Sequence, residues 1–312
     1  MGDGMRLPFS PVIHPWHEEV SDDPQLISEF IVKSMHDDRN PLMPIMEDKY
    51  AAREYVLEKQ ACQLTELFHW TQERPIRLPW DKLPKRCVIK TNHWSGDGIF
   101  IMDNGEEPIS GVKKDMAIHE IYRVVRDNRD QNGNRWSNRK IERKLNRLVK
   151  RKYPFKYEWA VRAIKPAGVL IEELLLTKKG TTPDDIKVHC FFGKAGFIQY
   201  EEGKFTSVKQ NLHDPITGDF IPQTENRKWP PIDEINNLRE HLGDEMFENI
   251  VSAAEKLSTE VAYVRVDLFM VDSEIYFGEF TLYPRTGQKQ SKEWEELGGK
   301  LWQQGLALSK AP

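Results

Sequence analysis

Apolar and polar residues alternate over two neighbouring stretches in the C-terminal third of the chain, 265–271 and 275–281. A period of two is typical of half-buried β-strands, so the pattern predicts a hairpin with a three-residue loop at 272–274. One face of this hairpin is predicted to be apolar. It consists of Val266, Leu268, Met270, Tyr276, Phe280 and Leu282.

The opposite face of the hairpin carries charged groups. A three-residue loop pairs Asp267 with Glu279, Arg265 with Thr281 and Phe269 with Phe277. A two-residue loop would instead place the two carboxylates on opposite faces of the sheet, so their pairing depends on the length of the loop.

The two opposed carboxylates indicate a cation site. Like charges on neighbouring strands repel each other, and a bound cation relieves the repulsion. Oxygen-only ligands suit Mg²⁺, which takes one or two carboxylates together with water and substrate phosphates. Arg265, two residues before Asp267, is able to hold phosphate oxygens bidentately. The alternative is a surface hairpin whose charges are solvated.

Helical periodicity predicts helices over 23–38, 48–61, 135–153 and 244–258. Asp48 is placed as the N-cap of the second helix, with Lys49 and Arg53 about one turn apart behind it. These two cations either contact a phosphate or carboxylate or form a solvated face, and the solvated face is the favoured interpretation. The basic helix 135–153 leaves the same choice between a polyanion and solvent.

A polar, glycine-containing loop over 91–98 separates two apolar strands, 87–90 and 99–102. It is neither a P-loop nor a dinucleotide fingerprint, because both require a helix after the glycines. Its backbone N–H groups, with His93, Ser95 and the preceding Lys90, nevertheless suit the covering of phosphates. An ordinary hairpin loop is the alternative.

Charged residues also interrupt apolar segments elsewhere. Glu172 and Glu173 break the run 163–176, which is costly unless the carboxylates reach a ligand or a charged partner. A second hairpin is predicted over 184–205, and Lys187 inside its first strand needs an anion. Residues 205–235 are rich in proline and are expected to be irregular.

Composition describes an ordinary globular protein. The chain has 312 residues, of which 39% are hydrophobic and 30% charged, enough for two domains or one large domain with subdomains. Its formal net charge of −4 gives no global reason to expect nucleic acid or an acidic membrane as a partner. Phosphate binding is therefore expected to be local.

Localisation and redox state follow from short features. The N-terminal stretch is polar and broken by prolines, and no 18 consecutive residues are apolar, so we expect a cytoplasmic protein without membrane insertion. The scattered cysteines Cys62, Cys87 and Cys190 lack metal-ligand spacing and are interpreted as reduced packing residues.

Several strings, taken together and in this order, resemble the ATP-grasp superfamily, and most closely its TupA-like branch, named for teichuronopeptide biosynthesis. They are DKYAAREYV, VIKTNH, IEELLL, DIKVHCFFGK, YVRVDLF and IYFGEFTLYP, spread between Asp48 and Gly287. The resemblance implies an α+β ATP-grasp fold, in which two α+β subdomains grip ATP between antiparallel sheets, with an N-terminal helical accessory segment. It implies an accessory or substrate region over 1–84, a subdomain with the phosphate loop over 85–175, and a subdomain with the magnesium site over 176–312.

The resemblance also implies roles for particular residues. The cofactors are ATP and Mg²⁺, with Asp267, Glu279 and Thr281 as metal ligands. The ATP-binding residues are Lys90, Ser95, Gly96, Gly98, Glu172, Glu173 and Lys187. Arg265, Lys187 and His93 are the implied catalytic residues.

Two positions depart from the pattern of the family. Trp94 stands where related loops have glycine, which is expected either to restrict loop closure or to stack on a ligand. Thr281 stands where many ATP-grasp enzymes have asparagine, and its hydroxyl is a shorter and weaker metal ligand. A second magnesium site is therefore the less secure expectation.

The implied activity is that of an ATP-dependent carboxylate–amine ligase that forms an amide through an acyl phosphate. Its partners would be a small-molecule or glycan-linked carboxylate and an amine, and the branch suggests a sugar acid in surface polysaccharide biosynthesis. A ligase that makes a dipeptide-like small molecule, a nucleotide-binding module without turnover, and a kinase that stops at phosphoryl transfer are the alternatives. The sequence indicates neither the substrates nor the oligomeric state.

Overall fold

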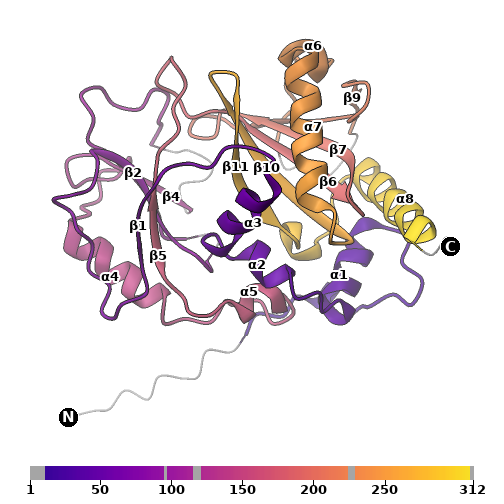
Figure 1. Ribbon diagram of the computed structural model, residues 1–312, viewed down its shortest axis with the longest axis horizontal. Helices are drawn as coiled ribbons and strands as arrows, with labels where there is room; N and C mark the ends of the chain where they lie inside the picture. Colours follow the sequence, from indigo (N-terminus) through magenta and orange to yellow (C-terminus); the bar gives the residue numbers. More distant parts are fainter. Residues whose placement is uncertain (1–10, 95–96, 115–120, 224–228, 310–312) are drawn as a thin grey trace.

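The computed structural model describes residues 11–94, 97–114, 121–223 and 229–309. Two β-sheets stand side by side in it (Figure 1). The first is five-stranded, in the order β1 (Leu67–Thr71), β5 (Val169–Glu172), β2 (Arg86–Thr91), β3 (Ile99–Asp103) and β4 (Tyr122–Val125). Its neighbours are antiparallel except β3 and β4, which are parallel.

The second sheet is six-stranded and antiparallel throughout. Its order is β11 (Glu274–Thr281), β10 (Tyr263–Val271), β6 (Asp185–Phe191), β7 (Lys194–Glu202), β8 (Lys209–His213) and β9 (Phe220–Ile221). Two mainly antiparallel sheets with helices around them confirm the predicted α+β class.

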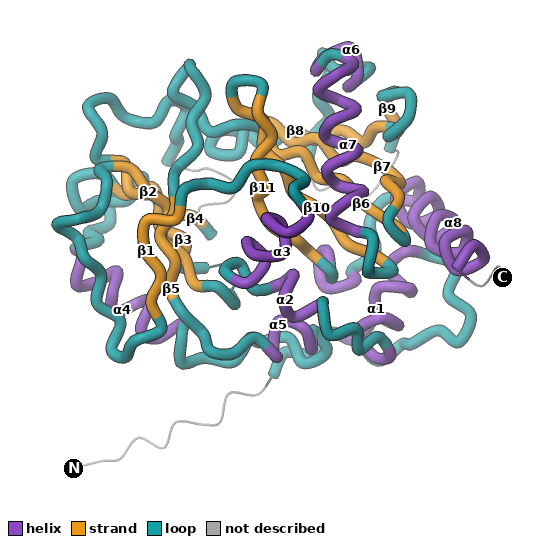
Figure 2. Tube along the Cα trace, in the orientation of Figure 1, coloured by secondary structure: helices purple, strands orange, loops and turns teal. Residues whose placement is uncertain are grey.

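Helices surround the second sheet, and α2 (Met43–Glu47) and α3 (Ala51–Lys59) stand between the two sheets (Figures 1 and 2). Beside the second sheet also lie α1 (Ile27–Asp37), α6 (Leu238–Leu242), α7 (Asp244–Ser258) and α8 (Lys292–Ser309). The first sheet carries α4 (Asn138–Leu148), and α5 (Trp159–Ala163) packs against α2. Short 3₁₀ turns occur at η1 (Pro15–His17) and η2 (Pro284–Gly287).

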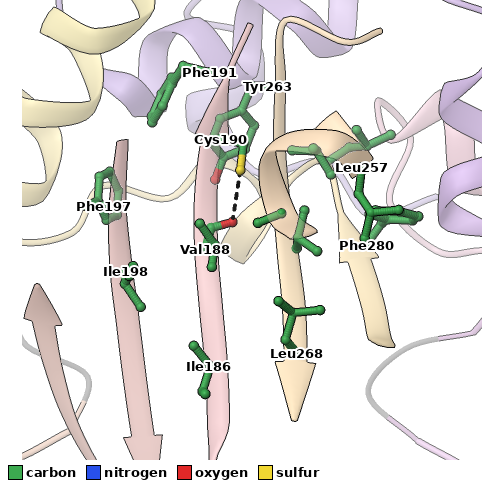
Figure 3. Close-up of a cluster of buried hydrophobic side chains, with 14 of the residues drawn as sticks. Ile186, Val188, Cys190, Phe191, Phe197, Ile198, Leu257, Tyr263, Leu268 and Phe280 are labelled. Atoms are coloured by element: carbon green, nitrogen blue, oxygen red, sulfur yellow. Dashed lines mark hydrogen bonds between the residues drawn. The ribbon is translucent and has the colours of Figure 1, made fainter. Parts of the chain in front are cut away.

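The main core lies between α7 and the second sheet. Alternate residues of β6, namely Ile186, Val188 and Cys190, are buried and belong to this core together with Leu257 of α7 (Figure 3). Since side chains alternate across a strand, the intervening residues of β6 point to the opposite face. The face towards α7 thus anchors the sheet. The other face has an aromatic part, where His189 and Phe197 contact Trp294 of α8, and a charged part at Asp185 and Lys187.

The C-terminal hairpin forms, but with a shorter loop than predicted. Only Asp272 and Ser273 separate β10 from β11, and both have positive φ, at 49° and 68°, as a tight hairpin turn requires. A bulge between Asp267 and Leu268 then shifts the register by one residue. Asp267 still lies opposite Glu279, because the bulge compensates for the missing loop residue.

The register on the loop side of the bulge differs from the prediction. The predicted pairing of Phe269 with Phe277 is wrong: Phe269 lies opposite Tyr276, and Phe277 opposite Leu268. Gly278 sits at the bulge, where a Cβ atom would lie 2.8 Å from the ring of Phe269 and 2.9 Å from the carbonyl oxygen of Asp267. The close approach of the strands at the bulge therefore requires glycine.

The predicted helices and strands are otherwise largely confirmed. The helix expected over 244–258 coincides with α7, and the basic helix is shorter than expected, at Asn138–Leu148. The sequence analysis did not predict α8. Its Trp302 stacks on Phe30 of α1, with ring centroids 5.1 Å apart, so the N-terminal helix is packed into the fold through a contact with the C-terminal one.

The N-terminal region contributes to both halves of the structure. Strand β1, from the expected accessory region 1–84, hydrogen-bonds to β5 in the first sheet, whereas α1, α2 and α3 contribute to the core of the second. The division at residues 84 and 175 stays a prediction.

The cysteines match the sequence analysis. Cys62, Cys87 and Cys190 are free thiols, and burial raises the pKa of each to about 12, as expected for packing residues. Among the described residues, no helix has both the length and the apolar character needed to cross a bilayer.

Gly299 tests how closely α1 and α8 pack. A Cβ atom there would overlap the carbonyl oxygen of Gln25, just before α1. Alanine gains about 1 kcal/mol over glycine in a free helix, but overpacking against a fixed backbone costs roughly 1–3 kcal/mol or more. Gly299→Ala is therefore expected to lower the free energy of unfolding in urea. Gln304→Ala, at an exposed position of α8, is the control and should change little.

Candidate functional site

A cleft with a volume of about 250 Å³ is lined by residues of both sheets. Most of its charged side chains come from β2, β5, β6, β7, β10 and β11. They are Lys49, Lys90, Glu172, Glu173, Asp185, Lys187, Glu201, Glu202, Lys204, Arg265, Asp267 and Glu279. The cleft therefore gathers charges that lie far apart in the sequence.

The hairpin supplies the opposed carboxylates. Asp267 and Glu279 face each other across β10 and β11, and both line the cleft. Arg265 holds Asp267 bidentately, since its Nε and Nη2 donate to Oδ1 and Oδ2 at 2.6 Å each. Nη2 also donates to the hydroxyl of Thr281 at 3.0 Å. Thr281 itself is not among the residues that line the cleft.

The two carboxylates differ in their electrostatic environment. Burial raises the pKa of Asp267, although Arg265 and Lys187 favour its ionised form. For Glu279 the desolvation of the cleft also opposes ionisation, but Lys49 and Arg265 outweigh it and lower the pKa of the carboxyl to about 2. Glu279 is thus an anion at neutral pH.

Lys187 has the anions that its place in a buried strand requires. Its Nζ lies 3.1 Å from a carboxylate oxygen of Asp185, 3.1 Å from Glu201 and 3.9 Å from Asp267. Lys204 pairs with Asp185 at 3.0 Å. Although burial opposes the charge on Asp185, Lys187 and Lys204 lower the pKa of this carboxyl to about 2. This confirms that the lysine in β6 is ion-paired.

The first sheet adds a second charged group to the cleft. Lys90, in β2, pairs with Glu172, at the end of β5, and Arg53 lies 3.6 Å from the same carboxylate. Glu173 accepts a hydrogen bond from the backbone N–H of Glu66 at 3.1 Å and also lines the cleft. Glu172, which is buried, therefore has the charged partners that the prediction required, whereas Glu173 is only half-buried and accepts a backbone hydrogen bond.

Residues 48–53 link the two sheets. Oδ1 of Asp48 accepts hydrogen bonds from the N–H groups of Tyr50 (2.9 Å) and Ala51 (3.2 Å), and its Oδ2 accepts one from Asn92 (2.9 Å). Lys49 points to the second sheet, where Nζ lies 3.4 Å from Glu279. Its side chain is only 11% exposed. Arg53 is likewise only 13% exposed and lies 3.6 Å from Glu172. The favoured interpretation of Lys49 and Arg53 as a solvated face is therefore wrong.

None of the described residues of the loop after β2 lines the cleft. His93 is buried outside the cleft lining, with Nε2 3.2 Å from the carbonyl oxygen of Arg151. Trp94 packs in an apolar cluster with Leu148, so in this structure it does not stack over the cleft. Gly98, with φ +84°, adjoins the side chain of Leu148.

Two further residues predicted to bind ATP, Ser95 and Gly96, lie outside the described residues. Lys90, Glu172, Glu173, Lys187, Arg265, Asp267 and Glu279 are brought together around the cleft. Their roles, like those of His93, Gly98 and Thr281, stay predictions.

Sequence reasoning missed several cleft residues. Asp185, Glu201 and Lys204 were not singled out. Asp185 stands two positions before Lys187 in the same strand, and period-two alternation could have placed both on one face. Glu201 and Lys204 come from β7 and the turn after it, and only pairing of the strands brings them to Lys187 and Asp185.

The oxygen donors at Asp267 and Glu279 fit Mg²⁺. The carboxylates are directly opposed, and the side chain of Glu279 is 41% exposed and open to the cleft. In the described part of the chain, no group of three or more His, Cys, Asp or Glu residues is arranged to hold a metal by itself. A hard cation that completes its shell with water and phosphate oxygens suits such a pair.

Comparisons with known proteins bear on the family of the chain. The sequence model described as TupA-like ATPgrasp matches residues 29–302. No functionally curated protein matches the sequence significantly.

Solved structures match the fold only weakly. D-alanine–D-alanine ligase from Bacillus anthracis, complexed with ATP, has a TM-score of 0.43 at 14% identity, over 85% of this chain and 66% of that one. VanG D-Ala:D-Ser ligase from Enterococcus faecalis has a TM-score of 0.42 at 12% identity, over 85% of this chain and 62% of that one. The ATP-grasp ligase PsnB, complexed with its minimal precursor, has a TM-score of 0.38 at 12% identity, over 91% of this chain and 68% of that one. The chain thus spans about two thirds of these ligases.

Asp185 offers a test of the electrostatics of the cleft. Its folded-state pKa, near 2, lies below the ordinary 3.8, so the carboxylate stabilises the fold above about pH 4 and loses this effect as the pH falls towards 2. Asp185→Asn should lower the free energy of unfolding by about 2 kcal/mol at pH 7. Urea unfolding curves should show roughly half of this difference near pH 3.

The control for this measurement is Asp37→Asn. Asp37 forms an exposed ion pair with Lys33 at 3.2 Å, and such pairs contribute roughly 0–1 kcal/mol. If Asp185→Asn lowered the free energy of unfolding by the same amount at pH 7 and at pH 3, the depressed pKa of Asp185 would be contradicted.

Proposed function

The chain belongs to the TupA-like ATP-grasp family, and from this premise we propose that it is an ATP-dependent carboxylate–amine ligase. The observation that carries the proposal is the pair Asp267 and Glu279, opposed on one face of the hairpin in a cleft that also holds Lys90, Lys187 and Arg265. Binding of a nucleotide alone does not need such a pair, whereas phosphoryl transfer does.

Mg²⁺ held by Asp267 and Glu279 would neutralise charge on the phosphate oxygens. Arg265 presents a planar fork beside the same carboxylates, which suits the oxygens of the phosphoryl group in transfer. Lys90 and Lys187 face the cleft from opposite sheets, so ATP between them would be contacted from both sides. Catalysis of this kind consists mainly of positioning and electrostatic stabilisation.

The proposed reaction has two steps. A carboxylate oxygen of the acid attacks the γ-phosphorus of ATP, and ADP leaves with the electrons of the broken P–O bond. The amine then attacks the carbonyl carbon of the acyl phosphate, phosphate leaves, and the nitrogen loses a proton. Arg265 would stabilise the charge that develops on the phosphoryl oxygens in both steps.

We further propose that the acid is a sugar acid and the product an amide of a surface polysaccharide or its precursor, acting in the cytoplasm. The support for this narrower proposal is the resemblance to the TupA-like branch, which is named for teichuronopeptide biosynthesis. A dipeptide-like product is equally compatible with the charges of the cleft. Analysis of products separates these ligases from a kinase, which would release ADP but form no amide.

Glu279→Gln tests the proposal. With Mg²⁺, ATP, and a panel of sugar acids and amino acids, wild type should release ADP and phosphate only when an acid and an amine are both present. Removing the charge of Glu279 should lower kcat/KM about 100-fold or more, because this carboxylate would hold the metal ion that stabilises the phosphoryl-transfer transition state. A coupled assay of ADP release measures kcat/KM, and mass spectrometry shows whether an amide product forms.

Glu274→Gln is the matched control, since Glu274 lies on the same strand but is exposed near the turn. It should retain activity within about threefold, a free-energy difference of less than 1 kcal/mol. Turnover by Glu279→Gln at the wild-type rate would rule out the metal role. Binding of ATP without turnover across the whole panel would favour a nucleotide-binding module.

A further inference from the structure

We propose that Lys49 forms a binding site for the carboxylate of the acid substrate. The ammonium group lies at the cleft face of the second sheet, 3.4 Å from Glu279, although Lys49 belongs to the segment before α3. This inference deepens the proposed function, and rests on it for the nature of the ligand as an acid.

The position of Lys49 is fixed by the backbone. Its N–H donates to the carbonyl oxygen of Asn92 at 3.1 Å, and the side chain of Asn92 is held by Asp48. Asn92 is fully buried and also accepts a hydrogen bond from the N–H of Gly168 at 2.8 Å. The lysine is therefore presented to the cleft from a turn between α2 and α3 that is anchored to Asn92, just after β2, rather than from a free helix surface.

The ion pairs of the cleft single out Lys49. Lys90 pairs with Glu172, and Lys204 with Asp185. Lys187 lies 3.9 Å from Asp267, but it also pairs at 3.1 Å with Asp185 and Glu201, so it would keep an anion if a metal ion took the opposed carboxylates. Within the described parts of the chain, Glu279 is the carboxylate within ion-pair distance of Lys49.

Glu47 is the other acidic group that acts on Lys49 electrostatically. Burial raises the pKa of Glu47 to about 7, so this carboxyl is only partly charged at neutral pH. It also accepts a hydrogen bond from the N–H of Leu282 at 2.8 Å, which occupies one of its oxygens. Glu47 therefore balances the charge of Lys49 less well than Glu279 does.

A cation bound at Glu279 would compete with Lys49 for the same carboxylate. Lys49 would then be a desolvated cation beside a divalent ion, which is unfavourable unless another anion arrives. The ammonium of Lys49, which carries only hydrogen-bond donors, would then be available to a carboxylate oxygen of the acid beside Glu279. The acid would thus be held next to the group that it must attack.

The first test needs neither metal nor nucleotide. Glu279→Gln removes the partner of Lys49, so this variant should bind D-glucuronate in EDTA about tenfold more tightly than wild type, as measured by NMR titration. The affinity for D-glucose, a neutral sugar of similar size, should be the same in the variant and in wild type. Adding Lys49→Met to Glu279→Gln should abolish the gain.

Lys59→Met, added to Glu279→Gln, is the matched control. Lys59 lies on α3 and pairs at 2.8 Å with Glu260, away from the cleft lining. This double variant should keep the gain. The proposal is overturned if Glu279→Gln shows no gain, if D-glucose gains equally, or if Lys49→Met leaves the gain intact. Thermal unfolding of each variant checks that it is folded.

Kinetics provide the second test, with the acid identified by the panel. Lys49→Met should raise the KM for that acid at least tenfold and leave the KM for ATP within about threefold, a free-energy change of less than 1 kcal/mol. A raised KM for ATP with an unchanged KM for the acid would assign Lys49 to the nucleotide instead. Carboxylate binding that depends on Lys49 in a protein without ligase activity would overturn the proposed function but not this site.

Discussion

The repulsion between Asp267 and Glu279 is the constraint on which the site depends. The two carboxylates are opposed on adjacent strands, and the fold compensates with Arg265 on one and Lys49 on the other. Both pairs lie in the cleft, where reduced solvation strengthens each interaction. A cleft that balances its own charges in this way is able to exchange them for those of a metal ion and an anionic substrate.

The hairpin shows how little of this arrangement depends on the turn itself. A two-residue turn alone would separate the carboxylates, and the bulge at Gly278 returns them to one face. Gly278 is needed there because the strands leave no room for a side chain. The sequence analysis therefore reached the right pair through the wrong loop length.

The N-terminal region is part of the site rather than a cap upon it. Helix α1 is held by α8 at the far end of the second sheet, while residues 48–53 reach across to Asn92 and Glu279. Charges from three distant parts of the chain meet as a result. Loss of any one of these segments would leave a buried ion without its partner, which is the costly case for charges of low exposure.

The sequence by itself determined the elements and the chemistry that depend on near neighbours. Period-two and helical patterns predicted α1, α3, α4 and α7 and the strands of the central hairpins, since burial of one face dictates them locally. They did not predict β8 and β9, which lie in the segment 205–235 that was expected to be irregular. The buried lysine in β6 and the glutamates at the end of β5 were recognised as needing partners, because a buried charge is costly wherever it lies.

Tertiary structure alone decided which partners those charges have. Lys49 follows a helix-cap residue and was interpreted as solvated, yet packing carries it to Glu279, 230 positions further along the chain. Glu201 and Lys204 reach Lys187 and Asp185 through strand pairing, which propensity does not encode. His93 and Trp94 were expected near the ligand, but apolar packing against α4 and its C-terminal neighbours buries them outside the cleft lining. Local pattern fixes which face of an element is polar, whereas the identity of an ion's partner depends on long-range packing.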